Sequence, residues 1–190
     1  MNSICDDFRN LLKETNAYDD KRRFVNFDHL WYEPKNLKTS TDLIYNFIWR
    51  EFQHLIPEDR LRLVILSPDH VKSDFGIIPI SVLVAHRIGC RFGVWKEFAS
   101  IKWGTSAIIG TKEPDLVCIV LQHVVQNGAT AVRIAHAISE MALDWKFQAF
   151  VAAVFKPEEG ENLKDSLAEV ANLLHFKPEF KYVVSTNDLK

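Results

Sequence analysis

From residue 61 onward, the pattern of hydrophobic and polar positions becomes regular. Short, continuous apolar runs, typical of strands buried on both faces, alternate with segments whose apolar residues recur at helical spacing. This alternation predicts an α/β fold with a mostly parallel sheet flanked by helices, right-handed crossovers, and ligands at the carboxyl ends of the strands. Strands are expected at residues 61–66, 91–95, 116–121, 147–155 and 182–184, helices at 76–88, 131–142 and 163–174, and a long excursion or hairpin at 97–110.

The first 57 residues show a different pattern. Apolar residues at helical spacing predict a short helix that ends near Asn16. Residues 21–37 are rich in aromatic and charged side chains and are expected to be extended, with turns. Candidate N-caps within residues 39–42 then predict a second helix, which Pro57 ends. We therefore predict an N-terminal lobe of helix, irregular hairpin and helix at residues 1–57, and an α/β core at residues 58–190.

The stretch from Leu116 to Leu143 carries the clearest functional signal. Its apolar run ends at Leu121 and is followed by polar residues, by the turn pair Asn127-Gly128, and by a helical pattern. A strand, a polar loop with glycine and a helix start can together aim backbone N–H groups and the helix dipole at an anion. An ordinary strand-to-helix turn, in which Gly128 only makes the turn, explains the same pattern equally well.

Composition and charge narrow the classes of function. At 190 residues the chain can hold one α/β domain with a substantial core, and a net charge of −2 argues against a general nucleic-acid or membrane-surface binder. Three cysteines without metal-ligand spacing, two of them (Cys90 and Cys118) at expected core positions, indicate reduced thiols and a cytoplasmic protein. Charged residues near the start argue against a signal peptide, and no apolar run has membrane-spanning length.

The sequence shows no recognisable motif for other common kinds of catalytic, cofactor or metal site. The sequence has neither a Ser-His-Asp elbow nor a GxGxxG dinucleotide loop, and Asp69-His70 has no companions at metal-ligand spacing, so no metal site is predicted. The Asp69-His70 pair remains a candidate for ligand contact at a strand end. A histidine titrates near neutral pH, so His123 could be an acid, a base or a switch, or else a hydrogen-bonded structural residue.

Several segments match the layout of one known family. The apolar strand 117–121 is followed by Gln122-His123, two further residues, and the loop 126–130 that opens a helix. This run is similar to the signature of the type I phosphoribosyltransferases, and among them the chain resembles the orotate phosphoribosyltransferases most closely. Residues 76–80 resemble the family's Gly-Ile-Pro helix start, residues 96–97 and 102–104 its basic mobile loop, and residues 24–37 the hood of the orotate enzymes.

The resemblance implies a fold and an activity. It implies a type I phosphoribosyltransferase-like α/β core with a small N-terminal hood. It also implies transfer of a phosphoribosyl group from phosphoribosyl pyrophosphate to an orotate-like or other base, with Mg²⁺ and release of pyrophosphate. Lys96 and Lys102 would then be catalytic, stabilising charge across a closing loop. Family members of this kind are commonly dimers, so the resemblance also implies a homodimer.

The match is poor where the family holds ribose and pyrophosphate. Gln122 and His123 replace the acidic pair that grips the ribose hydroxyls. Charge-assisted hydrogen bonds contribute about 1.5–3 kcal/mol each and neutral ones about 1 kcal/mol, so this replacement would weaken ribose binding by about 1–4 kcal/mol. The lysine expected before the Gly-Ile-Pro segment is missing, and Lys72 is the candidate to substitute for it. Trp95 and Trp103 replace the arginine and the histidine of the mobile loop.

The phosphate half of the signature is retained, because a cradle of backbone N–H groups depends on chain shape rather than on side-chain identity. Thr130 adds a hydroxyl at the helix start, where it could equally be a simple N-cap. The residues predicted to contact phosphate or ribose are Gln122, His123, Gln126, Asn127, Gly128, Ala129, Thr130 and Lys72.

Three functions are consistent with these observations. The first is a protein that binds a phosphorylated ribose ligand, as a nucleotide or as phosphoribosyl pyrophosphate, without efficient transfer. The second is an active phosphoribosyltransferase, for which Mg²⁺ would be expected. The third is a structural or partner-binding protein that keeps only the fold and uses its aromatic-rich N-terminal lobe as an interface. The retained loop and the replaced acidic pair favour the first, whereas the behaviour of the family favours the second.

Overall fold

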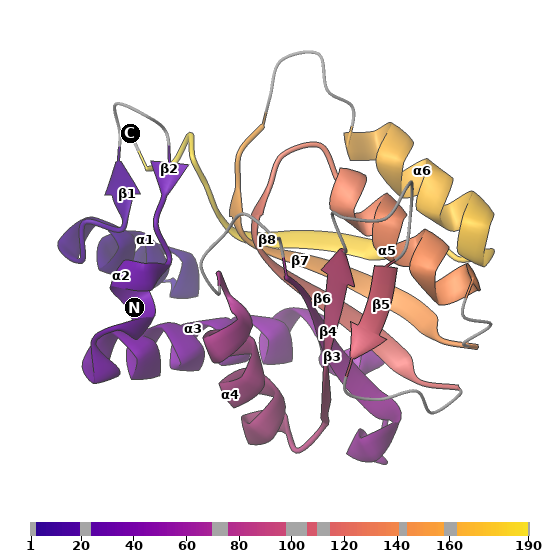
Figure 1. Cartoon of the computed structure of the whole chain (residues 1–190). Coiled ribbons are helices and arrows are strands. Elements are labelled where there is room, and N and C mark those ends of the chain that lie inside the picture. The colour runs from indigo at the N-terminus through magenta and orange to yellow at the C-terminus, as the bar shows by residue number, and fades with distance from the viewer. Residues whose placement is uncertain are drawn as a thin grey trace.

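The main sheet has six strands and confirms the predicted α/β class. A computed structural model describes residues 3–19, 24–69, 76–97, 106–109, 115–140, 144–157 and 163–189 (Figure 1). The strand order is β5-β4-β3-β6-β7-β8, and neighbouring strands are parallel except for the antiparallel pair β4–β5, whose second strand lies within the predicted excursion at residues 97–110. The strands are β3 (Leu63–Asp69), β4 (Arg91–Glu97), β5 (Ser106–Ile109), β6 (Val117–Val125), β7 (Lys146–Phe155) and β8 (Glu179–Ser185).

Helices cover both faces of this sheet (Figure 1). Alternate residues of the central strands enter two hydrophobic clusters, so that Ile65 and Ile119 face one layer while Val64 and Val120 face the other. The first layer holds α1 (Ile4–Glu14), α3 (Pro34–Phe52) and α4 (Ile78–Ile88), and the second holds α5 (Ala129–Glu140) and α6 (Leu163–Leu174).

Local sequence signals explain where α4 begins and ends. Pro79 lies in the first turn, where its missing N–H leaves no helical hydrogen bond unmade. Gly89 follows the helix with a φ of +80°, and its N–H donates to the Ala85 and His86 carbonyls. That left-handed conformation favours glycine, so the predicted end of the helix at Ile88 is confirmed.

The N-terminal lobe departs from the prediction in one respect. A short hairpin of β1 (Tyr18–Asp19) and β2 (Phe24–Val25) precedes α2 (Asp28–Trp31), and α3 begins at Pro34 rather than at residues 39–42. The expectation of extended structure up to residue 37 was wrong, because a proline at the first helical position starts the helix earlier than the later N-cap candidates. Residues of α1 and α3 share one hydrophobic cluster with the sheet. The division of the chain into an N-terminal lobe and an α/β core at residue 58 stays a prediction.

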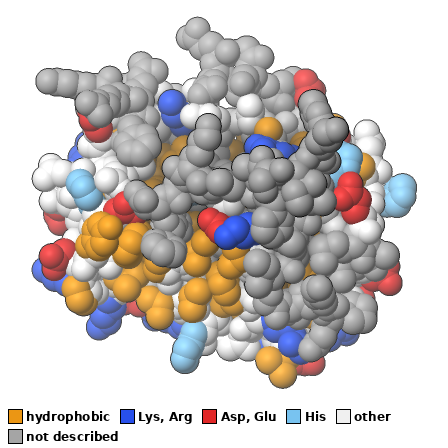
Figure 2. All heavy atoms as spheres, in the orientation of Figure 1, with side chains coloured by type: hydrophobic (Ala, Val, Ile, Leu, Met, Phe, Trp, Pro, Cys, Tyr) orange, Lys and Arg blue, Asp and Glu red, His pale blue; other side chains and the backbone are white. Residues whose placement is uncertain are grey.

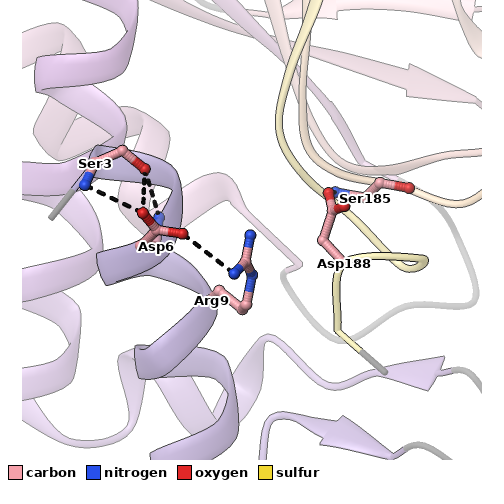
Figure 3. A network of polar contacts seen from close by, with 5 residues as sticks. All are labelled: Ser3, Asp6, Arg9, Ser185 and Asp188. Carbon is pink, nitrogen blue, oxygen red and sulfur yellow. Dashed lines mark hydrogen bonds and ion pairs between the residues drawn. The ribbon is translucent and has the colours of Figure 1, made fainter.

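The start of α1 lies beside the C-terminal turn (Figure 3). Ser3 caps the helix: its Oγ donates to Asp6 Oδ2 at 2.7 Å and accepts from the Asp6 N–H at 3.1 Å. The bonds from Ser3 lower the pKa of the Asp6 carboxyl, which also pairs with Arg9 Nη1 at 3.1 Å. Arg9 lies between Asp6 and the turn, in which the Ser185 N–H donates to Asp188 Oδ2 at 3.0 Å. This arrangement brings the first helix to the end of β8.

The cysteines are free thiols, as expected. Burial raises the pKa of the Cys90 thiol to about 12 and raises that of Cys118 well above its ordinary range. Both therefore stay protonated and poorly nucleophilic at neutral pH. No helix in the described part of the chain combines the length and the apolar character that crossing a bilayer requires.

Candidate ligand-binding site

The sheet opens between β3 and β6 at the carboxyl ends of the strands. From β3 the chain passes to β4 on one side, whereas β6, β7 and β8 follow on the other, so the direction of winding reverses between β3 and β6. Pairing of these two strands stops at Leu66 and Val120, although β3 continues to Asp69 and β6 to Val125. Ligands of open α/β sheets bind at such a switch point, which makes this opening the candidate site.

Two buried serines hold the strands together where the ladder ends. Ser67 Oγ lies 3.0 Å from the Leu121 carbonyl oxygen and 2.7 Å from Ser81 Oγ on α4. Ser81 Oγ in turn donates to the Ile77 carbonyl at 3.0 Å. The Ser67 hydroxyl therefore links β3 to β6 just beyond their last paired residues, and neither serine was among the residues predicted for the site. The one available signal was a pair of serines within otherwise apolar segments.

The strand β6 is longer than predicted and carries the signature positions. Gln122, Val124 and Val125 pair with residues of β7, so the expectation of a loop from residue 122 was wrong for its first part. The polar character of Gln122 and His123 suggested the end of the strand, but pairing with β7 continues it to Val125.

The loop that follows β6 has the compact shape expected of the signature. Asn127 Oδ1 accepts from the Ala129 N–H at 3.1 Å, which forms an Asx turn at the start of α5. Gly128 has a φ of +80°, and its carbonyl accepts from the Ala131 N–H at 2.9 Å. A Cβ at Gly128 would lie 2.8 Å from Leu163 Cδ1 and 3.0 Å from the Ser166 Cβ of α6. Glycine is therefore required here by backbone conformation and by space, whether or not a ligand binds.

Gln122 is buried beneath this loop. Only 6% of the residue is exposed, and its Nε2 donates to the Val124 carbonyl at 2.8 Å and lies 3.5 Å from Thr130 Oγ1. Its Oε1 is buried without a hydrogen-bond partner among the described residues. Gln122 thus ties the end of β6 to the start of α5, and Thr130, 8% exposed, faces it rather than solvent. Their contact with a ligand stays a prediction.

His123 points to the opposite layer of the sheet. Its half-buried ring meets the Phe27 ring edge-on, with centroids 5.7 Å apart and an interplanar angle of 77°. Phe27 belongs to the N-terminal lobe and is 3% exposed. The structure therefore separates the two side chains that replace the acidic pair: Gln122 faces α5, and His123 faces the lobe.

Lys96 stands at the end of β4, directly opposite Asp69 in the register of β3 and β4. Its Nζ lies 3.3 Å from Asp69 Oδ2, and their side chains are 41% and 28% exposed. The cation predicted to face the ligand is thus paired with a carboxylate at the same sheet edge. Lys72 and Lys102 lie outside the described residues, and so does His70. Gln126 is exposed on the loop after β6.

Solved structures share this architecture over nearly the whole chain. No family model matches the sequence, and no curated protein gives a significant match. Mycobacterium tuberculosis H37Rv orotate phosphoribosyltransferase in complex with inorganic phosphate has a TM-score of 0.64 at 12% identity, covering 100% of this chain and 92% of that one. Its complex with 5-phospho-alpha-D-ribosyl 1-diphosphate has a TM-score of 0.61 at 12% identity, covering 97% and 92%. A phosphoribosyltransferase from Corynebacterium diphtheriae has a TM-score of 0.63 at 15% identity, covering 99% of each chain.

The chain has the fold of the type I phosphoribosyltransferases. The resemblance drawn from the sequence is thus confirmed for the fold. That no family model matches accords with a degenerate signature. The loop at residues 126–130 has the tight turn expected from its sequence, and the side chains of Gln122 and His123 point to opposite layers of the sheet.

Proposed function

We propose that this protein binds a phosphorylated ribose ligand, a nucleotide or phosphoribosyl pyrophosphate, at the opening between β3 and β6 without efficient transfer. The loop at residues 126–130 carries the proposal, because its Asx turn and buried glycine present backbone at the start of α5, where anions bind. The complexes of the M. tuberculosis enzyme with phosphate and with 5-phospho-alpha-D-ribosyl 1-diphosphate support the ligand class. Gln122 and His123, which lack a carboxylate, argue against efficient transfer.

Calorimetry with ribose 5-phosphate, nucleoside monophosphates and phosphoribosyl pyrophosphate tests this proposal. Wild-type protein should bind at least one of them, and Gln126→Glu should weaken that binding about fivefold or more, since a carboxylate near a phosphate costs about 1 kcal/mol even in water. Gln53→Glu, the same change at an exposed position outside the loop, should leave the affinity unchanged. Absence of binding by every ligand at millimolar concentration would refute the proposal and favour a structural or partner-binding role.

An active phosphoribosyltransferase is the second candidate. Lys96 favours it, because this cation lies at the carboxyl end of β4, next to the end of β3 that borders the opening. Transfer would use Lys96 and Lys102 to stabilise developing charge, with Mg²⁺ present. Pyrophosphate release from phosphoribosyl pyrophosphate, followed over a panel of bases, separates the two candidates. If the protein binds phosphoribosyl pyrophosphate but releases no pyrophosphate with any base, the transferase is excluded and the binding role remains.

We also propose that the protein forms a homodimer through α4. Val82 and Leu83 on this helix are 42% and 39% exposed, and Figure 2 shows hydrophobic side chains gathered over α4 and the neighbouring start of α3. Contiguous apolar surface of this kind marks interaction sites. Sedimentation should give a dimer at micromolar concentration, and Leu83→Lys should convert it to a monomer. Leu61→Lys, at an exposed leucine outside α4, should leave it dimeric, and a monomeric wild type would refute the proposal.

A further inference from the structure

The two ribose positions are poorly suited to a magnesium ion, which the phosphoribosyltransferase fold would lead one to expect. Mg²⁺ takes oxygen ligands in a near-octahedral shell, usually one or two carboxylates with several retained waters. His123 offers ring nitrogens, which suit zinc, copper, iron and nickel better, and its ring packs against Phe27. Gln122 offers one amide oxygen, which is buried and therefore not accessible to an ion that keeps its waters.

Asp69, a carboxylate at this sheet edge, is already paired with a cation. Asp69 Oδ2 lies 3.3 Å from Lys96 Nζ, so a cation bound by Asp69 would meet the ammonium group at close range. Within the described part of the chain, no group of three or more His, Cys, Asp or Glu side chains could hold a metal. The donor set of the described residues therefore disagrees with a resident Mg²⁺.

The backbone at the start of α5 would then supply part of the positive charge that faces the ligand. The start of α5 provides the equivalent of about half a positive charge together with N–H donors, which suits a single phosphate group. A diphosphate has a higher charge density and binds proteins most readily with a cation between its oxygens. The loop at residues 126–130 has the shape for the first case, and the described part of the chain holds no cluster of three or more His, Cys, Asp or Glu side chains that could hold the cation of the second.

We infer that this protein binds a monophosphorylated ribose, such as a nucleoside monophosphate or ribose 5-phosphate, without any divalent cation. The inference rests on the proposed function and narrows its ligand class. It separates the protein from a transferase whose substrate is a magnesium-chelated diphosphate.

Calorimetry in two buffers, one with excess MgCl₂ and one with excess EDTA, tests the inference. The dissociation constants for ribose 5-phosphate and nucleoside monophosphates should agree within about twofold between the buffers, and phosphoribosyl pyrophosphate with MgCl₂ should bind no more tightly. Binding that strengthens about tenfold or more with MgCl₂ overturns the inference but leaves the proposed function intact. Absence of binding by every ligand in both buffers overturns the proposed function itself, and this inference with it.

A further measurement does not depend on small differences in affinity. Free Mn²⁺ gives a strong electron paramagnetic resonance signal that should not fall when wild-type protein and ribose 5-phosphate are added together, and a fall overturns the inference.

Discussion

Gly128→Ala should lower the free energy of unfolding by about 2–4 kcal/mol. The residue has a φ of +80°, where a Cβ is strained, and the new atom would lie 3.0 Å from the Ser166 Cβ. The Leu163 methyl group, 2.8 Å away, can rotate aside, but the Ser166 Cβ is fixed to the backbone of α6. The loop or α6 must then shift, so the affinity for a phosphorylated ribose should fall as well. Urea denaturation and calorimetry measure the two effects.

Gly89→Ala is the matched control for this substitution. Gly89 has the same φ of +80°, but a Cβ there would meet nothing within 4 Å. Its replacement should cost only the backbone strain, about 1–2 kcal/mol, and should leave ligand affinity unchanged. The difference between the two variants isolates the contact between the loop and α6. Equal losses of stability would show that α6 shifts at little energetic cost and that glycine is required at residue 128 only for its backbone conformation.

The fold was predictable from the sequence because the central strands β3, β6 and β7 contain short apolar runs bounded by turn signals. The length of β6 was not predictable in this way, because a neighbouring strand decides it. β6 continues through Gln122 and His123 because β7 supplies a partner up to Phe155, and the polarity of residues along one strand does not show this. The early start of α3 has a local cause instead, because Pro34 begins the helix although better N-cap residues follow it.

The candidate site was predictable only where it depends on backbone shape. Asn127-Gly128 marks a tight turn from residue type alone, and the structure places it at the start of α5. The pairing of Lys96 with Asp69 follows from the register of β3 and β4, which no local pattern reveals. The same holds for the ring contact of His123, whose partner lies far away in the sequence.

Phe27→Ala should be among the most destabilising substitutions in this chain, with a loss of about 3–5 kcal/mol. The ring is 3% exposed within the cluster that joins the N-terminal lobe to the sheet, so its removal leaves a cavity at that junction. It also removes the aromatic partner of His123, and the histidine ring should become mobile. Urea denaturation gives the stability change, and the His123 ring signals in nuclear magnetic resonance spectra report the second effect.

Two controls separate loss of packing from loss of this particular contact. Phe176→Ala removes the same atoms from a side chain that is 42% exposed, and it should change stability by no more than about 0.5 kcal/mol. Phe27→Leu restores most of the apolar volume but not the ring edge, so it should recover stability while His123 remains mobile. If Phe27→Leu also fixes the histidine, general packing holds His123 in place. If Phe27→Ala is nearly neutral, the lobe contributes little to the fold, and the position of His123 must then depend on the rest of its surroundings.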